Sequence, residues 1–381
     1  MSRADVDTIV VGAGVIGLSI AFELLRRGRS VLLVEKSRPG AGSTHAAGGM
    51  LAPVCEAEEQ PPGLTELSLD SAARYPGFVA DLERVAGRRT GYREDGTLSL
   101  AFTRDVYAEV SRLAETLASM ELPFERVDAA RIGELESHLS SRVVGGLHIL
   151  GDRQIDPRAL VQVLQRAVQK LGGRFRCPQA VTEVLRDGRR ATGVRSEDPE
   201  GRERVTSADN IVLSAGAWTT ADIAGGEPGL TVRPVKGQLV RLQGAPLIRH
   251  VVRTPEVYMI PREGGELLIG ATVEEVGFDT TPRAGAVLDL LRHAWEALPG
   301  TYDLAYVGVD VGLRPATDDH LPLIGPTSTA GLFLATGHYR NGILLAPATA
   351  FGVADWIEGA NVDERVAAFD PRRHVLPETL R

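Results

Sequence analysis

Two short runs of consecutive apolar residues near the start of the chain flank a segment with helical spacing. Residues 7–11 form a short apolar run with β-branched side chains and residues 30–34 form a second apolar run, as expected for buried strands. Between them, apolar residues recur at helical spacing from Leu18 to Arg27, and Gly28 ends the pattern. The sequence therefore predicts a strand, a tight turn, a helix and a second strand, the unit that begins many parallel sheets.

Further along the chain, the same style of pattern returns in separate pieces. Helices are expected over 64–85 and 156–171, the second with Asp156 as its cap and Pro157 in its first turn. We assign to the first sheet the apolar runs at 180–186, 191–196, 210–214 and 332–336. A helix is expected to follow from about 342 to 358.

Other segments predict a second sheet of a different kind. They alternate in polarity or pair as antiparallel strands, and they lie at 96–102, 237–242, 257–260 and 266–271. Gly264-Gly265 is expected to form the turn between the last two. The chain is therefore expected to hold two sheets, the first built from discontinuous segments.

The turn after the first strand has the form of a phosphate-binding loop. Gly12 permits the tight turn, Gly14 lets the backbone approach a pyrophosphate, and Gly17 lets the helix pack closely on the strand. The helix N-terminus offers backbone N–H groups and a partial positive charge to an anion. Glu35, at the end of the second strand, is placed to accept hydrogen bonds from a ribose diol. These residues predict a dinucleotide site, although the turn alone does not separate NAD from FAD.

Two more glycine-containing segments favour FAD. Ser214-Ala215-Gly216 follows an expected strand, and Gly337 to Gly342 (Gly-His-Tyr-Arg-Asn-Gly) lies near the C-terminus. A nicotinamide dehydrogenase does not need this layout, whereas a large flavin held by both chain ends does. A helix that starts near Gly342 would place its positive end beside the flavin ring and stabilise the reduced, anionic cofactor.

The expected fold class is α/β, with a Rossmann-type FAD-binding domain and a second, mixed and largely antiparallel sheet as the substrate-binding domain. The FAD-binding domain is expected to be discontinuous, at 1–88, 145–228 and 312–381. The substrate-binding domain is expected at 89–144 and 229–311.

Composition and charge narrow the range of partners. Of the 381 residues, 43% are hydrophobic and 24% are charged, which is ample for a large core. The net charge of -8 and the absence of a basic run give no reason to expect nucleic-acid binding. No apolar segment approaches the roughly 20 residues that span a bilayer, and residues 1–7 lack the features of a secretory signal. We expect a cytoplasmic protein with small-molecule partners, and leave a homo-oligomer open.

The chain contains two cysteines, Cys55 and Cys177, with no CxxC pair. We expect no disulfide, no structural zinc and no other metal site. Each cysteine is interpreted as a small buried hydrophobe, with a nucleophile or a flavin attachment point as the alternative.

Several segments, beyond the glycine turn, carry a resemblance to a known family. They are Thr8 to Glu35, Ser43 to Leu51, Pro234 to Gly237, Tyr258 to Arg262, Gly270 to Thr272, Gly312 to Pro315 and Gly337 to Pro347. In these segments the chain resembles the D-amino-acid-oxidase-like flavoproteins and, within them, the glycine oxidases of thiamine biosynthesis. The first segment is shared by many flavoproteins, whereas the last three are more specific.

The resemblance implies oxidation of glycine, sarcosine and small D-amino acids by hydride transfer to FAD, with O2 reduced to H2O2. It also implies non-covalent FAD. In related sarcosine oxidases a cysteine attaches the flavin just after the strand that bears the counterpart of Arg314, and here residues 315–326 contain no cysteine.

Three residues are candidates for the catalytic site. Arg314 is the candidate receptor for a substrate carboxylate, because a planar guanidinium can donate two parallel hydrogen bonds. The alternative for Arg314 is a structural ion pair with Asp318 or Asp319. Tyr258 is interpreted either as a hydroxyl directed at the carboxylate or as a core aromatic. Arg340 resembles a family residue near substrate and flavin, with an ion pair to a carboxylate elsewhere as the alternative.

No protein base is assigned, because hydride transfer from a neutral amine needs positioning rather than a base acting on carbon. His338 and His45 therefore receive no proton-transfer role. Met50, Leu51 and Ala52 resemble the segment that covers the flavin and narrows the substrate cavity.

The glycine turn and the resemblance together define the cofactor candidates. They are Gly12, Gly14, Val15, Ile16, Gly17, Glu35, Lys36, Ser43, Thr44, Ala47, Gly48, Gly49, Met50, Val181, Ala215, Gly216, Trp218, His338, Arg340, Asn341, Gly342, Ile343 and Leu344.

Other functions stay open at this point. An FAD-dependent amino-acid dehydrogenase or a 2-hydroxy-acid oxidase of the same fold would use the same cofactor site. A flavin-binding scaffold without turnover is a different class, which the carboxylate receptor argues against. Val273 and Glu256 stand where a well-known family member has other residues, so the preferred substrate is not transferred.

Overall fold

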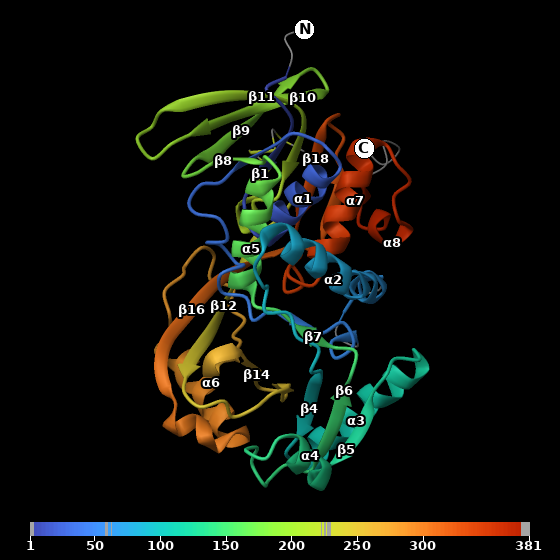
Figure 1. Ribbon diagram of the computed structural model, residues 1–381, viewed down its shortest axis with the longest axis vertical. Coiled ribbons are helices and arrows are strands. Elements are labelled where there is room, and N and C mark those ends of the chain that lie inside the picture. The colour runs from blue at the N-terminus through green and yellow to red at the C-terminus, as the bar shows by residue number, and fades with distance from the viewer. Residues whose placement is uncertain are drawn as a thin grey trace.

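The computed structural model describes residues 4–57, 60–61, 63–221, 223–224, 226 and 230–374. Figure 1 shows two lobes stacked along the long axis of the molecule, each built around its own sheet. The chain passes between the lobes several times, so both lobes combine segments that are far apart in the sequence.

The first sheet has the strand order β17-β18-β11-β1-β2-β8, and β9 and β10 extend it from β11. Its strands are β1 (Val6–Val11), β2 (Val31–Val34), β8 (Arg174–Arg176), β9 (Ala180–Asp187), β10 (Arg190–Glu197), β11 (Glu203–Leu213), β17 (Leu323–Pro326) and β18 (Leu332–Thr336). The central strands β8, β2, β1, β11 and β18 pair in parallel, whereas β9, β10 and β17 pair antiparallel. Successive side chains of β1 serve two cores: Val10 packs towards the helices, and Ile9 and Val11 pack towards β9 and β10.

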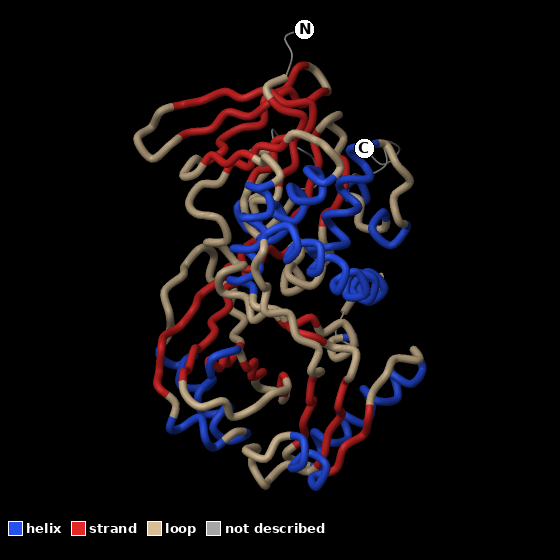
Figure 2. The backbone as a smooth tube through the Cα atoms, viewed as in Figure 1, coloured by secondary structure: helices blue, strands red, loops and turns tan. Residues whose placement is uncertain are grey.

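Helices cover one face of this sheet (Figure 2). They are α1 (Val15–Arg26), α2 (Leu64–Ala86), α5 (Pro157–Lys170), α7 (Ala346–Glu358) and the short α8 (Glu364–Ala367). Helix α1 packs against α5 and α7, and α2 packs against the same two helices. Asp156 caps α5 by accepting hydrogen bonds from the N–H groups of Arg158 and Ala159.

The second sheet has the order β16-β12-β15-β14-β13-β4-β6-β5 and is antiparallel except where β13 pairs with β4. Its strands are β4 (Thr97–Ala101), β5 (Glu125–Asp128), β6 (Gly145–Ile149), β12 (Arg233–Gln243), β13 (Val251–Arg253), β14 (Tyr258–Pro261), β15 (Glu266–Gly270) and β16 (Ala305–Ala316). Its helices are α3 (Arg104–Ser119), α4 (Ala129–Leu135) and α6 (Ala284–Ala297). A two-stranded sheet of β3 (Met50–Leu51) and β7 (Arg153–Gln154) lies between the lobes (Figure 1).

The observed α/β fold with two sheets confirms the expected fold class. The division into two domains stays a prediction; β6, which starts at the boundary expected at residue 145, pairs with β4 and β5. The C-terminal helix was expected from about Gly342 and begins at Ala346. Pro347 accounts for this start, because proline favours the first turn of a helix and offers no N–H to a preceding turn.

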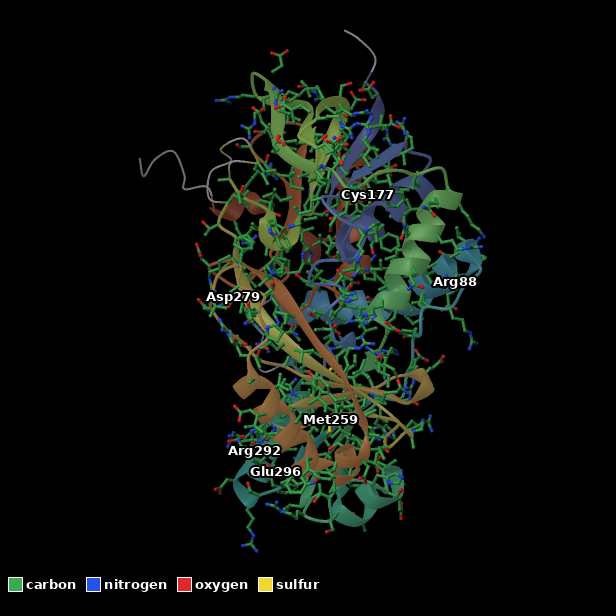
Figure 3. The ribbon with its side chains drawn as sticks, turned by 90° about the vertical axis from the view of Figure 1, so that its left-hand side faces the viewer. Arg88, Cys177, Met259, Asp279, Arg292 and Glu296 are labelled. Carbon is green, nitrogen blue, oxygen red and sulfur yellow. The ribbon has the colours of Figure 1, made fainter. Side chains whose placement is uncertain are left out.

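The two cysteines differ in their surroundings. Cys55 is buried, as expected. The expectation for Cys177 was wrong: it is exposed, in the connection that follows the edge strand β8 and leads to β9. Figure 3 shows Cys177 in the upper lobe, far from Met259 of the lower sheet. Within the described part of the chain, no helix is long and apolar enough to cross a membrane, and no cluster of metal-ligand side chains is found.

Candidate functional site

A cavity of about 540 Å³ lies where the two lobes meet, within the usual size range of a small-molecule site. The first lobe contributes the glycine turn and residues 34–37, 214–216, 335–336 and 338–344. The second lobe contributes residues of β12, β14 and β16. One cavity therefore connects the expected nucleotide site with the expected substrate site.

The glycine turn is too crowded for side chains at two of its positions. Gly12 has φ +97°, and a Cβ there would lie 2.6 Å from the carbonyl oxygen of Ser214. A Cβ on Gly17 would lie 2.0 Å from the carbonyl oxygen of Gly12. Gly17 does not line the cavity, so its part is the close packing of α1 on the turn. The start of α1 is held by Thr44, whose Oγ1 accepts from the N–H of Val15 at 3.2 Å.

Glu35 joins the turn to the end of β2. Its Oε2 accepts from the N–H of Ala13 at 2.8 Å, and its Oε1 accepts from the N–H of Ser37 at 2.9 Å. Oε1 also accepts from the Ser37 hydroxyl at 3.2 Å. The carboxylate lines the cavity, and Oε2 retains a second lone pair for a ligand. Beside it, the Nζ of Lys36 lies 3.2 Å from the centroid of the Trp218 ring, and burial lowers the pKa of Lys36.

Arg314 lies at the other end of the cavity, on β16. Its guanidinium lies over Gly237 of β12, where a Cβ would lie only 2.5 Å from Cζ. Nη1 donates to the carbonyls of Thr272 at 3.0 Å and Lys236 at 3.3 Å. Among the described residues, Arg314 has no carboxylate partner. The pair with Asp318 or Asp319 that was the structural alternative is not formed, and Asp319 instead pairs with Arg373 at 3.2 Å.

Tyr258 lies against two glycines. A Cβ on Gly270 would lie 2.5 Å from its ring and hydroxyl, and a Cβ on Gly48 would lie 3.6 Å from its hydroxyl. Burial raises the pKa of Tyr258, and Arg314 and Arg340 only partly oppose this shift. Near neutral pH the hydroxyl therefore stays protonated, and it can donate a hydrogen bond into the cavity.

Arg340 lines the cavity from an exposed position after a strained residue. Tyr339 has φ +47°, and its N–H donates to the carbonyl of Pro315 at 2.9 Å, which ties this loop to β16. The Cζ of Arg340 lies 5.3 Å from the centroid of the Tyr339 ring.

The geometry gives neither histidine a place as a base. His338 is buried, its Nε2 lies 3.0 Å from Oγ1 of Thr349, and burial lowers its pKa to about 3. It is therefore neutral at physiological pH. His45 does not line the cavity, and burial together with Arg158 lowers its pKa.

The structure brings together the three catalytic candidates and every cofactor candidate except Gly17 around this one cavity. Met50 and Ala52 line it, whereas Leu51 is buried beside it. Val273 also lines the cavity, and Glu256 does not.

Sequence reasoning missed several lining residues, among them Glu56, Gln238 and Gly237. Glu56 pairs with Arg253 at 3.3 Å. The sequence offered one signal for Glu56: it is an acidic residue shortly after the segment that was expected to cover the flavin. Gly237 belongs to one of the segments that resemble the family, but no role was assigned to it from the sequence. Its role is to leave room for the Arg314 guanidinium, which only the structure reveals.

The residues present fit FAD. Gly14, like Gly12, lines the cavity without a side chain between the backbone and a ligand, as a pyrophosphate requires. Glu35 is available to a ribose, and the cavity extends between the lobes to Tyr258 and Arg314.

Comparison with known proteins defines the class. A family model described as FAD dependent oxidoreductase (DAO) matches residues 7–356, and the chain belongs to this family. It is 34% identical to the glycine oxidase of Geobacillus kaustophilus over 97% of both chains. It is also 34% identical to the bifunctional protein ThiO/ThiG of Trichormus variabilis over 95% of this chain and 54% of that protein. The crystal structure of the Geobacillus kaustophilus glycine oxidase has a TM-score of 0.89 to this structure, with 32% identity, covering 98% of this chain and 100% of that one.

Proposed function

We propose that this FAD-dependent amino-acid oxidase deaminates glycine and other small amines, such as sarcosine and small D-amino acids, and passes the electrons to O2, which becomes H2O2. A place in thiamine biosynthesis, which the resemblance implies, is part of the proposal. When bound, FAD supplies the acceptor for the hydride that leaves the substrate carbon. The protein's own residues then bind the substrate, orient it and exclude water from it.

The observation that carries the proposal is the setting of Arg314. Its guanidinium faces the cavity over a glycine, one nitrogen is anchored by two backbone carbonyls, and no described carboxylate neutralises it. A partly buried cation without a charged partner gains from an anion that arrives to pair with it. A substrate carboxylate satisfies that requirement, and the remaining N–H groups can bind it as a fork.

Tyr258 and Arg340 complete the proposed receptor. The protonated Tyr258 hydroxyl donates to the same carboxylate, and Arg340 adds positive charge at the cavity wall. With the carboxylate fixed at this end, the amine and Cα of a small substrate point towards the glycine-lined part of the cavity where the flavin fits. No side chain is needed as a base on carbon, in agreement with the neutral, hydrogen-bonded His338.

Replacement of Arg314 tests the proposal. Arg314→Met should reduce kcat/KM for glycine by two to four orders of magnitude, since loss of a bidentate ionic contact removes roughly 3–5 kcal/mol of transition-state binding. Arg314→Lys should restore only part of it, because a point charge cannot reproduce the fork. The assay follows H2O2 and O2 together, which also separates oxidase from dehydrogenase turnover.

Glycine ethyl ester is the matched substrate, because it keeps the amine and lacks the carboxylate. Wild type and Arg314→Met should oxidise the ester with similar efficiency, and their flavin spectra should agree. Near-normal turnover of glycine by the variant, or loss of its flavin, would make Arg314 structural and defeat this assignment.

A further inference from the structure

Lys236 is a fully buried lysine in the strand that carries Gly237. None of its surface is exposed, and its Nζ donates to the carbonyl of Thr281 at 2.6 Å. Oε2 of Glu274 lies 3.5 Å from the same ammonium. Successive side chains of a strand point to opposite faces, so Lys236 lies on the face of β12 away from the Arg314 guanidinium. The buried charge of Lys236 therefore has a function other than contact with the substrate.

Glu274 collects further contacts around this pair. Its Oε1 accepts from Nε2 of Gln238 at 2.6 Å and from Oγ1 of Thr272 at 2.8 Å. Burial raises the pKa of Glu274, but the hydrogen bonds from Gln238 and Thr272 and the charge of Lys236 outweigh it and hold the pKa below its ordinary value. The carboxylate is therefore ionised near neutral pH.

These contacts fasten an irregular segment, residues 271–283, to β12. The segment joins β15 to α6 without regular structure, and Asp279 marks it in Figure 3. The backbones of Lys236 and Glu274 exchange two hydrogen bonds of 2.9 Å. Further along, Oε1 of Gln238 accepts from the N–H of Arg283 at 2.8 Å. Side chains of Lys236 and Gln238 thus hold the segment near its start, at 272–274, and near its end, at 281–283.

The fastened segment also sets the orientation of Arg314. Nη1 of Arg314 donates to the carbonyl of Thr272, and the Thr272 hydroxyl is held between Glu274 and the N–H of Gln238. The second acceptor of Nη1 is the carbonyl of Lys236 itself. Both carbonyls that anchor the guanidinium therefore belong to β12 and to the segment that the Lys236–Glu274 pair holds against it.

We propose that Lys236 and Glu274 are positioning residues for Arg314: the ion pair between the buried lysine and the partly exposed carboxylate clamps segment 271–283 onto β12 and so fixes the two carbonyls that aim the guanidinium at a carboxylate in the cavity. This inference rests on the proposed role of Arg314 as the carboxylate receptor. It explains why a charged lysine is kept at a fully buried position, where an apolar side chain is often as stable.

The test uses the FAD-loaded protein and measures carboxylate binding apart from turnover. Acetate is titrated into the oxidised enzyme and followed by the change in flavin absorbance, and kcat and KM are measured for glycine and glycine ethyl ester. The variants are Glu274→Gln and Lys236→Met. The double variant Lys236→Met/Glu274→Gln is added because it leaves no unpaired charge, and so it keeps the test usable if Lys236→Met alone fails to fold.

The matched control is Glu275→Gln. Glu275 is the next residue of the same segment and also pairs with β12, through Arg233 at 2.7 Å, but its side chain is 66% exposed. A surface pair of this kind contributes little. The control should bind acetate and glycine as wild type does.

We expect the network variants to weaken acetate binding and raise KM for glycine by on the order of tenfold or more, the size of one misplaced charge-assisted hydrogen bond. The kcat for glycine should change less than KM, and the ester kinetics should stay within about twofold of wild type. Unchanged acetate binding in Glu274→Gln and in the double variant overturns the inference. Equal losses with glycine and the ester overturn it as well, because they indicate a general structural role.

Arg314→Met in the same titration separates this inference from the proposed function. If Arg314→Met abolishes acetate binding while the network variants keep it, only the positioning role fails. If Arg314→Met binds acetate normally, the carboxylate receptor itself is wrong, and the positioning role fails with it.

Discussion

Glu35 combines a structural and a proposed cofactor role in one carboxylate. It already accepts hydrogen bonds from the N–H groups of Ala13 and Ser37, so both of its oxygens are oriented before any ligand arrives. Such pre-orientation lowers the cost of binding a ribose diol. Glu35→Gln replaces one oxygen by an NH2 group, which would face an N–H donor.

For Glu35→Gln we expect FAD affinity to fall by about 1–3 kcal/mol, the range for a hydrogen bond to a charged acceptor. Turnover per bound flavin should remain near that of wild type. Fluorescence titration of the apoprotein with FAD measures the affinity. Ser37→Ala, which removes only the 3.2 Å side-chain contact to Glu35, is the control and should change it little. Equal FAD affinity in Glu35→Gln and wild type would exclude Glu35 from the cofactor site.

Asp152 is a buried acid whose pKa differs strongly between the folded and unfolded chain. It has no exposed surface, Oδ1 accepts from the N–H of Val54 at 3.2 Å, and the buried Oδ2 has no hydrogen-bond partner. Burial raises its pKa from 3.8 to about 7. Between these two values the folded state keeps a proton that the unfolded state releases, so this residue lowers stability as pH rises through that window.

Asp152→Asn should remove that pH dependence. The free energy of unfolding of the variant relative to wild type should increase by up to about 4 kcal/mol between about pH 4 and about pH 8, which is the shift of roughly three pKa units. Urea denaturation at several pH values measures it. Parallel pH profiles for the two proteins would show that Asp152 is ionised in the folded state as readily as in the unfolded one.

At the scale of single residues, the sequence revealed positions whose chemistry is local and hid those that depend on packing. The glycine turn and Glu35 follow from spacing along a few residues, and Arg314 followed from a family segment. Lys236 and Glu274 are 38 positions apart in the sequence, and the residues around each of them do not predict that the two side chains form an ion pair. Glu56 was missed because its inward direction depends on the surrounding fold.

At the scale of elements, strands with continuous apolar runs were found, whereas half-buried elements were missed. β1, β2, β11 and β18 were predicted because the parallel sheet buries both of their faces. β16 was not predicted, because much of it lies at the sheet edge and is only partly buried. Helix α3 was overlooked although Thr103 caps it and Val110, Leu113, Ala114 and Leu117 form its buried stripe.

Two glycines in helices, Gly17 of α1 and Gly77 of α2, should respond in opposite ways to replacement by alanine. Gly17→Ala would place Cβ 2.0 Å from backbone that cannot move without shifting the turn, whereas Gly77, on the exposed side of α2, has nothing within 4 Å. Gly17→Ala should lose FAD binding or fail to fold. Gly77→Ala should stabilise the protein by about 0.5–1 kcal/mol, because alanine favours the helix. Flavin content and thermal unfolding of both variants provide the measurement, and an FAD-loaded Gly17→Ala would contradict the proposed packing role.

At the scale of the whole molecule, the cavity is assembled from almost the full length of the chain. Its lining runs from Val11 to Leu344 and includes both sheets. A ligand that contacts both lobes binds only the folded arrangement, so its binding energy adds to the stability of both. The sequence could predict the two lobes from their patterns, but the way they meet depends on long-range packing that no local pattern contains.

The same arrangement predicts that FAD is held without a covalent bond to cysteine. Cys55 is buried next to the cavity without lining it, and Cys177 is exposed after β8. After precipitation with acid, intact FAD should therefore appear in the supernatant and leave a colourless pellet. Cys55→Ser and Cys177→Ser should release the same amount of flavin as wild type, because neither thiol is a point of attachment. Flavin that remains in the wild-type pellet and is released from one of the serine variants would identify that cysteine as the attachment point and refute the prediction.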